Sequence, residues 1–190
     1  MKYLRYFISV FLLSILALQA FFFLQILAWR WVNPPITAFQ LAERHRLCGW
    51  SIPYIHSCEI KQEWIEFKKI SPYLKRAITI SEDSDFYRHA GFEPQAMKDA
   101  WDRNQKNSKH LRGGSTITQQ LAKNLFLSGE KNYVRKVQEL AITAMLEIAL
   151  PKNRIFEIYL NSVEWGEGVF GIAAASQHYF AIKPNQLSME

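Results

Sequence analysis

The chain has 190 residues, of which 49% are hydrophobic and 14% aromatic, so it can bury one core but is too short for two full domains. This composition excludes a disordered chain. The formal net charge of +6 and a pI near 9.3 favour an anionic partner, such as a lipid headgroup, a pyrophosphate or a nucleic acid. No zinc-type Cys/His spacing, RNP-like motif or continuous basic run is present in the sequence, so no nucleic-acid partner is expected.

The first segment has the length and composition of a membrane span. Residues 6–29 carry no charge and, at about 1.5 Å per residue, would form roughly 36 Å of helix, enough to cross a hydrocarbon core of about 30 Å. A cleaved signal peptide would have a shorter apolar region. We therefore predict an uncleaved signal anchor, with residues 1–5 in the cytoplasm because Lys2 and Arg5 precede the span. The alternative is a buried core helix.

Residues 30–69 are predicted to be a linker and membrane-proximal segment, because a proline pair after Asn33 stops the helix and the pattern that follows is mixed. The two cysteines of the chain, Cys48 and Cys58, fall in this segment. On the outer side of the membrane they could close a small loop or stay free thiols, and the sequence leaves both open. No metal site is expected from this pair alone.

The remaining segment, 70–190, is predicted to be one mainly helical domain. Helices are expected at 73–81, 92–103, 133–150 and 153–161, with a mobile polar loop at 105–114. Apolar residues surround the 133–150 segment from Val137 onward, which predicts a central helix. Few stretches alternate with period two, so the predicted fold class is all-α.

Residues 112–124, RGGSTITQQLAKN, combine a glycine turn with the start of an amphipathic helix that Ser115 or Thr116 would cap. An inward apolar stripe is formed by Ile117, Leu121 and Leu125. A neighbouring face carries Thr116, Gln120 and Lys123. A helix N-terminus behind such a turn suits a phosphate or a pyrophosphate. The alternative is a helix cap with a solvated polar face.

Two glutamates are candidates for catalysis. Glu82 follows an apolar segment, and a carboxylate at the edge of an apolar wall is suited to proton transfer. Glu139 lies one turn after Arg135 and three residues after Lys136, and two such cations beside a carboxylate could hold a pyrophosphate. The alternatives are a helix cap for Glu82 and a structural ion pair for Glu139. His89 is expected to be a structural residue.

Four ordered motifs of the chain resemble those of the family 51 peptidoglycan glycosyltransferases. They are EDSDFYRHAG (82–91), GGSTITQQLAKN (113–124), RKVQE (135–139) and KNRIFEIYLN (152–161). With one N-terminal anchor and no penicillin-binding domain, the chain resembles the monofunctional members from Gram-negative bacteria. The similarity covers about residues 70–180, and it implies a lysozyme-like, mostly helical fold with residues 70–190 as the catalytic domain.

The resemblance implies a hexosyltransferase that polymerises lipid II. The growing chain on undecaprenyl pyrophosphate would be the donor and the 4-hydroxyl of lipid II the acceptor, which gives a β-1,4 bond with inversion. Glu82 would be the general base, and Glu139 would assist departure of the pyrophosphate or orient the groups that bind it. Substrate or pyrophosphate binding is implied for Asp83, Ser115, Thr116, Gln119, Gln120, Lys123, Asn124, Arg135 and Lys136. Structural support is implied for Phe86, His89, Gly91, Lys152, Glu157 and Asn161.

The same resemblance implies a single-pass protein of the bacterial inner membrane with a periplasmic catalytic domain. Its implied partners are lipid II, the growing glycan chain and membrane lipid, and penicillin-binding and cell-division proteins are left open as further partners. No protein-built metal site is predicted, but a magnesium or manganese ion that accompanies the pyrophosphate is also left open. Family members continue into an arginine-bearing fifth motif, so the sequence is expected to be a fragment or a naturally short chain.

Two other functions compete with polymerisation. A lytic transglycosylase would share the general fold and an essential glutamate, but it should lack the basic group formed by Lys123, Arg135 and Lys136. A non-catalytic, membrane-anchored partner of cell-wall assembly would be favoured by loss of Glu82 or Glu139, and both are present.

Overall fold

The computed structural model describes residues 2–48, 60–95, 98, 99, 102, 105, 114–127, 129 and 132–188. Most of the described chain is helical, which confirms the predicted fold class in its main feature. Cys58 and the side chain of Cys48 lie outside the described residues. So do residues 96, 97, 100, 101 and 103 of the helix expected at 92–103 and, apart from its two ends, the loop expected at 105–114.

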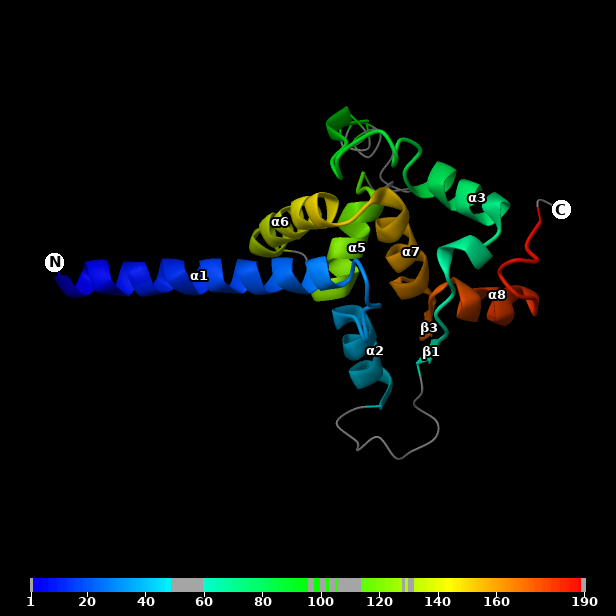
Figure 1. The fold of residues 1–190 in the computed structure, drawn as a ribbon, viewed down its shortest axis with the longest axis horizontal. Helices are drawn as coiled ribbons and strands as arrows, with labels where there is room; N and C mark the ends of the chain where they lie inside the picture. The colour runs from blue at the N-terminus through cyan, green and yellow to red at the C-terminus, as the bar shows by residue number, and fades with distance from the viewer. Residues whose placement is uncertain are drawn as a thin grey trace.

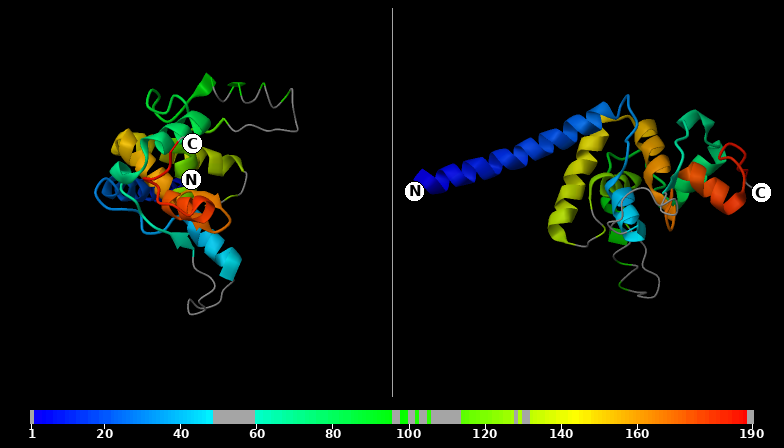
Figure 2. Two further views of the ribbon diagram at one scale, coloured as in Figure 1. Left: turned by 90° about the vertical axis from the view of Figure 1, so that its right-hand side faces the viewer. Right: turned by 90° about the horizontal axis from the view of Figure 1, so that it is seen from below.

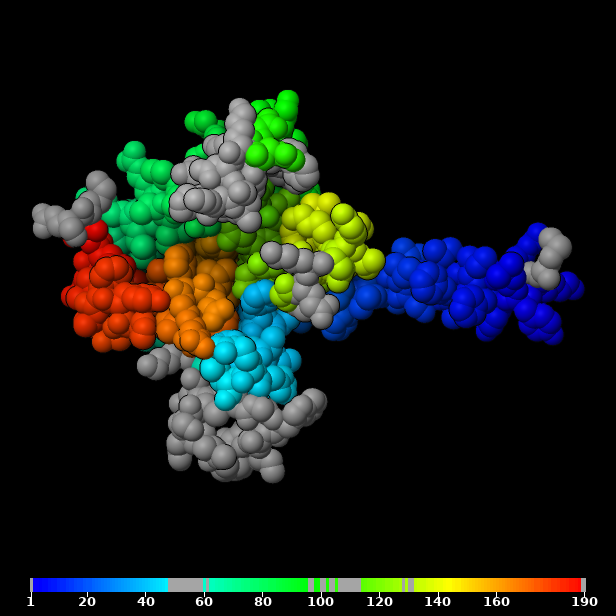
Figure 3. Space-filling model, turned by 180° about the vertical axis from the view of Figure 1, so that it is seen from behind, coloured from blue at the N-terminus to red at the C-terminus, as the bar shows by residue number. Residues whose placement is uncertain are grey.

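The N-terminal helix α1, Lys2–Ala28, is long and apolar enough to cross a membrane and projects from the body of the molecule (Figures 1 and 3). Its side chains are exposed from residue 2 to residue 18, which excludes the alternative of a buried core helix. At its other end Ile26 and Trp29 are buried, and Phe22 and Trp29 both pack on Phe126. The anchor helix therefore has a free part and a base that belongs to the folded domain.

The segment after the proline pair contains a helix that the sequence pattern did not reveal, α2, Ala38–Cys48. The main-chain N–H of Gln40 donates to Thr37 Oγ1 at 3.1 Å, and the N–H of Thr37 donates to Gln40 Oε1 at 2.8 Å. This reciprocal pair is a capping box, which starts a helix without any apolar periodicity. Residues 30–69 are therefore partly helical, and α2 packs against the helix Ile117–Phe126, labelled α5.

The other predicted helices occur with ends that differ slightly from the sequence expectation. They are α3 (Pro72–Glu82), α5 (Ile117–Phe126), α6 (Tyr133–Ala149) and α7 (Lys152–Ser162). The 3-10 helix η1 (Phe67–Lys69) and the helix α8 (Ile172–Phe180) were not expected. The ends differ because caps and proline decide the first turn, and periodicity does not report them. In Figure 2, α8 lies near the end of the molecule opposite the free end of α1.

Helix α5 lies in the middle of the domain, where α2, α6 and α7 pack against it (Figure 1). Its stripe Ile117, Leu121 and Leu125 is buried, which confirms the spacing argument. The aromatic rings of Phe86 and Phe156 belong to the same core, with centroids 5.5 Å apart. Burial of this stripe holds α5 rigidly, so its polar face has a fixed position.

Helix α6 differs from its prediction as a central helix. Ile142 and Leu146 are fully buried on one side, but Val137 is 67% exposed and Ile148 is 76% exposed on another. The apolar residues that surround α6 in the sequence are therefore not all covered by the described part of the chain. A helix whose sequence is apolar on all sides is expected to have an apolar environment, which can be lipid as well as protein.

A small three-stranded sheet accompanies the helices of the mainly helical fold. Strand β1 (Lys61–Gln62) pairs in parallel with β3 (Val169–Phe170), which pairs antiparallel with β2 (Glu164–Gly166). Strands of two or three residues are too short to show period-two alternation, so the pattern could not reveal them.

Gly171, after β3, has a φ of +78°, and a Cβ there would lie 2.6 Å from the main-chain oxygen of Asn161.

Candidate active site

Glu82 is the last residue of α3, and its side chain is exposed. Gln120 of α5 donates from its amide nitrogen to Glu82 Oε2 at 3.0 Å. The hydroxyl of Tyr159 on α7 donates to Gln120 Oε1 at 3.1 Å. These two bonds connect three helices and turn the NH2 group of Gln120 toward the carboxylate. Glu82 is therefore an accessible carboxylate in a fixed position, which is what a general base requires.

The Tyr159 hydroxyl acts as a donor because it stays protonated. Burial, together with the negative charges of Glu82 and Asp83, raises the pKa of Tyr159 well above that of an ordinary tyrosine. A neutral phenol has one O–H proton, and Gln120 Oε1 receives it. The orientation of the Gln120 amide is therefore set by Tyr159.

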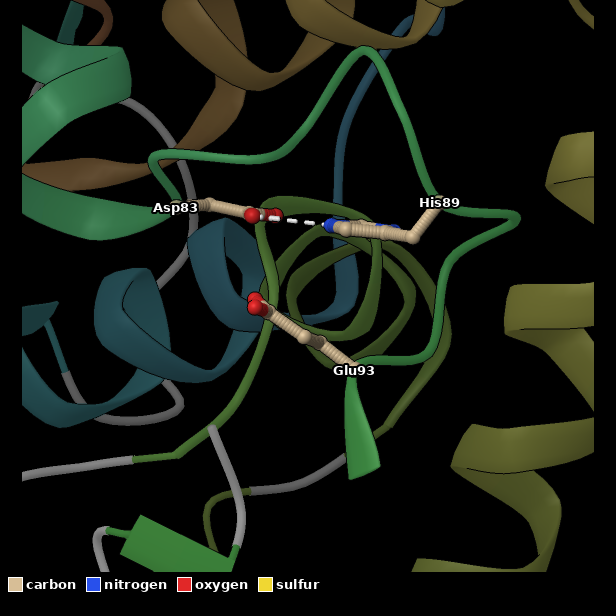
Figure 4. A group of neighbouring side chains, drawn as sticks. All are labelled: Asp83, His89 and Glu93. Atoms are coloured by element: carbon tan, nitrogen blue, oxygen red, sulfur yellow. Dashed lines mark hydrogen bonds and ion pairs between the residues drawn. The ribbon is translucent and has the colours of Figure 1, made fainter. Parts of the chain in front are cut away.

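Asp83 connects the turn after α3 to the start of α5. Its Oδ2 accepts the main-chain N–H of Ile117 at 2.9 Å, and its Oδ1 accepts from His89 Nε2 at 2.8 Å (Figure 4). The Asp83 side chain is 1% exposed. The resemblance implied substrate binding by Asp83, but both oxygens are used inside the protein. In this structure Asp83 holds the first turn of α5 in place.

Asp83, His89 and Glu93 bring potential metal-ligand atoms within 4.8 Å of one another (Figure 4). His89 Nδ1 accepts the main-chain N–H of Gly91 at 3.0 Å, so the proton of the neutral ring is on Nε2 and points to Asp83. A metal ion would need the lone pair of Nε2 and would break this bond. The trio therefore does not fit a metal ion. A divalent cation that arrives with the pyrophosphate stays a prediction.

Thr116 caps α5, as the sequence predicts. Its hydroxyl accepts the main-chain N–H of Gln119 at 3.2 Å and donates to the main-chain oxygen of Gly91 at 2.7 Å. The side-chain oxygen of Gln119 accepts the N–H of Thr116 at 3.2 Å, which completes a capping box. Both side chains are buried and use these groups within the cap, and binding of a ligand by them stays a prediction. Ser115, just before the helix, is half-buried.

Glu139 lies near the start of α6 and is buried. Arg135 donates to its Oε2 at 2.7 Å, and Lys136 donates to its Oε1. These contacts confirm the i,i+4 and i,i+3 pairs expected from the sequence. Arg135 Nε is buried without a hydrogen-bond partner among the described residues. Two cations on one carboxylate leave a net positive charge, which suits an anionic ligand.

Lys123 adds a third cation at the same end of the α5–α6 pair, because it lies in the last turn of α5 while Arg135 lies in the first turn of α6. Its ammonium lies 5.2 Å from the ring centroid of Phe39. No carboxylate in the described ranges forms an ion pair with it. The neighbouring Asn124 is buried and donates to the main-chain oxygen of Gln120 at 2.9 Å, so its amide stabilises α5.

The residues expected to give structural support make their contacts within the fold. Lys152 pairs with Glu147 at 2.8 Å and lies 4.4 Å from the ring centroid of Phe86. Glu147 also accepts from the Thr118 hydroxyl at 2.6 Å. Gly91 has a φ of +82° and packs closely against α6. This group joins α5, α6 and α7 behind the polar face of α5.

Glu157 and Asn161 of α7 bind the chain that precedes α3. Glu157 Oε1 accepts the main-chain N–H of Phe67 at 3.1 Å. The fully buried Asn161 accepts the N–H of Ile65 at 2.8 Å and donates to the oxygen of the same residue at 3.0 Å. Both side chains therefore use their polar atoms to hold η1 and the segment just before it against α7.

A cavity of about 940 Å³ lies at another place, between η1, α8 and residues 182–185. Glu157 lines it, but Glu82, Glu139 and Lys123 do not. The cluster of charged and hydrogen-bonded residues along α5 and α6 is therefore a better candidate active site than this cavity, because it contains the groups that can transfer a proton and bind an anion.

Sequence reasoning missed Tyr159 and Glu147. Tyr159 lies in an apolar helix and is buried. A buried tyrosine needs a hydrogen-bond partner for its hydroxyl, and this need was the one weak signal in the sequence for a role of Tyr159. The partner, Gln120, lies 39 positions away in the sequence, and spacing does not reveal such a contact. Glu147 gave no comparable signal.

The geometry agrees with comparisons to known proteins. A family model described as "Transglycosylase" matches residues 52–190, and the chain belongs to this family. Its class is accordingly that of the glycosyltransferase enzymes.

Curated relatives share the whole length of the chain. A protein of Cupriavidus metallidurans named "Biosynthetic peptidoglycan transglycosylase" is 56% identical over 100% of this chain and 80% of its own length. Proteins with the same name from Cupriavidus pinatubonensis and Ralstonia nicotianae are 54% and 53% identical, over 100% of this chain and over 74% and 80% of their own lengths. These matches span α1 as well as the residues of the candidate active site.

Proposed function

We propose that this chain polymerises the glycan strands of peptidoglycan, with lipid II as the acceptor and the strand on undecaprenyl pyrophosphate as the donor. The relatives named for peptidoglycan support the polymer, and the apolar helix α1 supports a lipid-linked substrate. The observation that carries the proposal is the exposed Glu82 carboxylate, held by Gln120 on the same helix that bears Lys123. The base at the end of α3 is thus bonded to α5, and the cations lie on α5 and α6.

The proposed step is an inverting transfer. Glu82 removes the proton of the acceptor 4-hydroxyl, the oxygen forms a bond to the anomeric carbon of the donor, and the bond from that carbon to the pyrophosphate breaks. The pyrophosphate leaves with the bonding electron pair, and a β-1,4 link results. Because Gln120 binds Oε2, the other oxygen of Glu82 is the one that faces the acceptor proton. General-base assistance of this kind contributes about 10²- to 10⁴-fold in rate.

The departing pyrophosphate needs positive charge. Arg135 and Lys136 supply it, and Lys123 adds to it from the end of α5. Glu139 orients Arg135 and Lys136, because each of its oxygens accepts from one of them. Charge-assisted hydrogen bonds that are already in place cost no reorganisation when the negative charge develops.

The proposed location is the bacterial inner membrane, with the N-terminus in the cytoplasm and the catalytic domain in the periplasm. Lys2 and Arg5 before the apolar segment support this orientation. Lipid II, the growing glycan and membrane lipid are the proposed partners. Contacts with penicillin-binding and cell-division proteins stay predictions.

A polymerisation assay with labelled lipid II tests the proposal. The full chain in detergent should give a ladder of longer glycans, and Glu82→Gln should slow its formation by about 100-fold or more. Glu66→Gln is the matched control, because Glu66 is an exposed residue that pairs with Lys69 on the surface, and such pairs contribute little. It should give the ladder of the parent.

Three other outcomes would contradict the proposal. An unchanged ladder from Glu82→Gln would exclude Glu82 as the base. No ladder from a folded parent would favour a non-catalytic assembly partner. Shortening of preformed glycan by the parent, in place of extension, would favour a lytic transglycosylase.

A further inference from the structure

Helix α2 brings an aromatic ring to the cation of Lys123. The ring of Phe39, in the first turn of α2, has its centroid 5.2 Å from the Lys123 ammonium. This distance is within the range of about 6 Å over which the negative face of an aromatic ring attracts a cation. Figure 1 shows α2 directly below α5, in agreement with the packing of these two helices. A residue from outside the four sequence motifs therefore lies beside the candidate active site.

The position of the Phe39 ring is fixed by its surroundings. Thr37 and Gln40 form the capping box at the start of α2, and both side chains are buried. The first turn of the helix, which includes Phe39, therefore has a fixed backbone. A Cβ on Gly129 would lie 3.8 Å from Phe39 Cζ, so the tip of the ring reaches the connection between α5 and α6. The ring thus lies where the three cations of the candidate site are carried.

The kind of partner decides how much charge Lys123 can offer to a ligand. Arg135 and Lys136 share the Glu139 carboxylate, so these two cations and one anion leave one net positive charge. Lys123 adds a second one, and none of the ion pairs in the described part of the chain includes it. An aromatic ring attracts an ammonium without neutralising it and occupies only one side of the group. The N–H donors on the other sides stay available for an anion.

We propose that Phe39 is a positioning residue, which holds the Lys123 ammonium where this group meets the oxygens of a pyrophosphate. The inference rests on the proposed function, since it assigns one further residue to the binding of the leaving pyrophosphate. A free lysine side chain loses rotamer entropy when it binds an anion, and a side chain that the ring already holds loses less. Phe39 acts on the anion only through Lys123.

Fluorination of Phe39 tests this role, because fluorine atoms draw electron density from the face of the ring and leave its shape almost unchanged. The full chain in detergent carries mono-, di- or trifluorinated phenylalanine at position 39, and titration calorimetry measures its affinity for inorganic pyrophosphate. The Kd should rise stepwise with fluorination, by about 3- to 10-fold for the trifluorinated ring. A ring that only fills space would give the same Kd throughout, and that result would overturn the proposal.

Phe67 gives the matched control. The Lys75 ammonium lies 4.3 Å from the Phe67 ring centroid, and this pair belongs to η1 and α3 instead of the group of cations on α5 and α6. Fluorination of Phe67 should leave the Kd for pyrophosphate unchanged. Lys123→Gln removes the cation, so fluorination of Phe39 should have no further effect in that variant. Equal fluorination effects with and without the Lys123 ammonium would show that the ring acts by another route and would refute the positioning role.

Polymerisation of labelled lipid II by the same samples separates this inference from the proposed function. A parent that binds pyrophosphate with the expected dependence on fluorine, but makes no glycan, would contradict polymerisation and support the role of Phe39. A parent that makes glycan, but whose Kd for pyrophosphate does not respond to fluorination, would refute the role of Phe39 alone. A folded parent that binds no pyrophosphate would also overturn the inference.

Discussion

Arg154 of α7 donates from Nε to the main-chain oxygen of Trp29 at 2.8 Å, and this bond attaches the C-terminal end of the anchor helix to the catalytic domain. The same guanidinium donates to the main-chain oxygen of Val32 at 2.9 Å and to Glu157 at 2.9 Å. The last carbonyl groups of a helix have no helical partner and carry partial negative charge, so a cation is favourable there. The C-terminal end of α1 is thus fixed to the domain through Arg154.

We expect Arg154→Ala to lower the free energy of unfolding by about 2–4 kcal/mol, because it leaves two carbonyl groups and one carboxylate without their charged donor. Thermal unfolding in detergent measures the change. Arg88→Ala is the control, since the Arg88 side chain is 85% exposed and pairs with Asp85 on the surface. Equal melting temperatures for the two variants would contradict the role of Arg154.

Gly91→Ala should destabilise the fold by about 1–3 kcal/mol. Gly91 has a φ of +82°, and an added Cβ would lie 2.8 Å from Thr143 Cγ2 and 2.9 Å from Glu147 Cγ. At Gly129 a Cβ would meet only the Phe39 ring, at 3.8 Å, so Gly129→Ala should be close to neutral. Denaturant unfolding of both variants tests the prediction, which fails if Gly91→Ala is as stable as Gly129→Ala.

The free energy of unfolding should fall as pH rises above 10. Burial raises the pKa of Tyr159 in the folded chain above the ordinary value of 10.0, so above that pH the unfolded chain loses a proton that the folded chain keeps. The stability is therefore complete below pH 10 and declines by at most about 1.4 kcal/mol per pH unit from this group. Tyr159→Phe should make the decline shallower, whereas Tyr73→Phe, at an exposed position, should not. Identical pH slopes would refute the assignment.

The sequence allowed those parts of the structure to be predicted that depend on neighbours along the chain. The pairing of Glu139 with Arg135 and Lys136 follows from helical spacing, and so does the buried stripe that begins at Ile117. The capping role of Thr116 follows from its place before an apolar run. These interactions join residues no more than four positions apart or repeat with the helical period. The spacing of residues along the sequence therefore predicts them.

The rest depends on how distant segments pack. Glu82 and Gln120 are 38 positions apart, and no spacing rule links them. The contact of Thr116 with Gly91 and the contact of Asp83 with His89 both depend on the folded turn after α3, so the sequence did not indicate them when it predicted that Thr116 and Asp83 bind a ligand. The exposed side of α6 was predicted to be buried, because apolar residues on all sides of a helix do not show which side the rest of the chain covers.

The hydrogen bond from Tyr159 to Gln120 makes a prediction about catalysis. Without the phenol hydroxyl, the Gln120 amide can rotate and present its carbonyl oxygen to Glu82, where two acceptors repel each other. We expect Tyr159→Phe to lower the kcat of glycan polymerisation by about 3- to 10-fold with little change in KM, because the acceptor proton is transferred less often and binding is unaffected. Steady-state polymerisation of lipid II measures both constants.

The control for this substitution is Tyr179→Phe, which also removes one hydroxyl hydrogen bond, to the main-chain oxygen of Trp165, at an exposed position. It should leave kcat unchanged. A double-mutant cycle identifies the path of the effect: if Tyr159 acts through Gln120, then adding Tyr159→Phe to Gln120→Ala should cost almost nothing further. Full additivity of the two losses would show that Tyr159 influences the reaction by another route, and a loss in KM alone would show that it affects binding and not the position of Glu82.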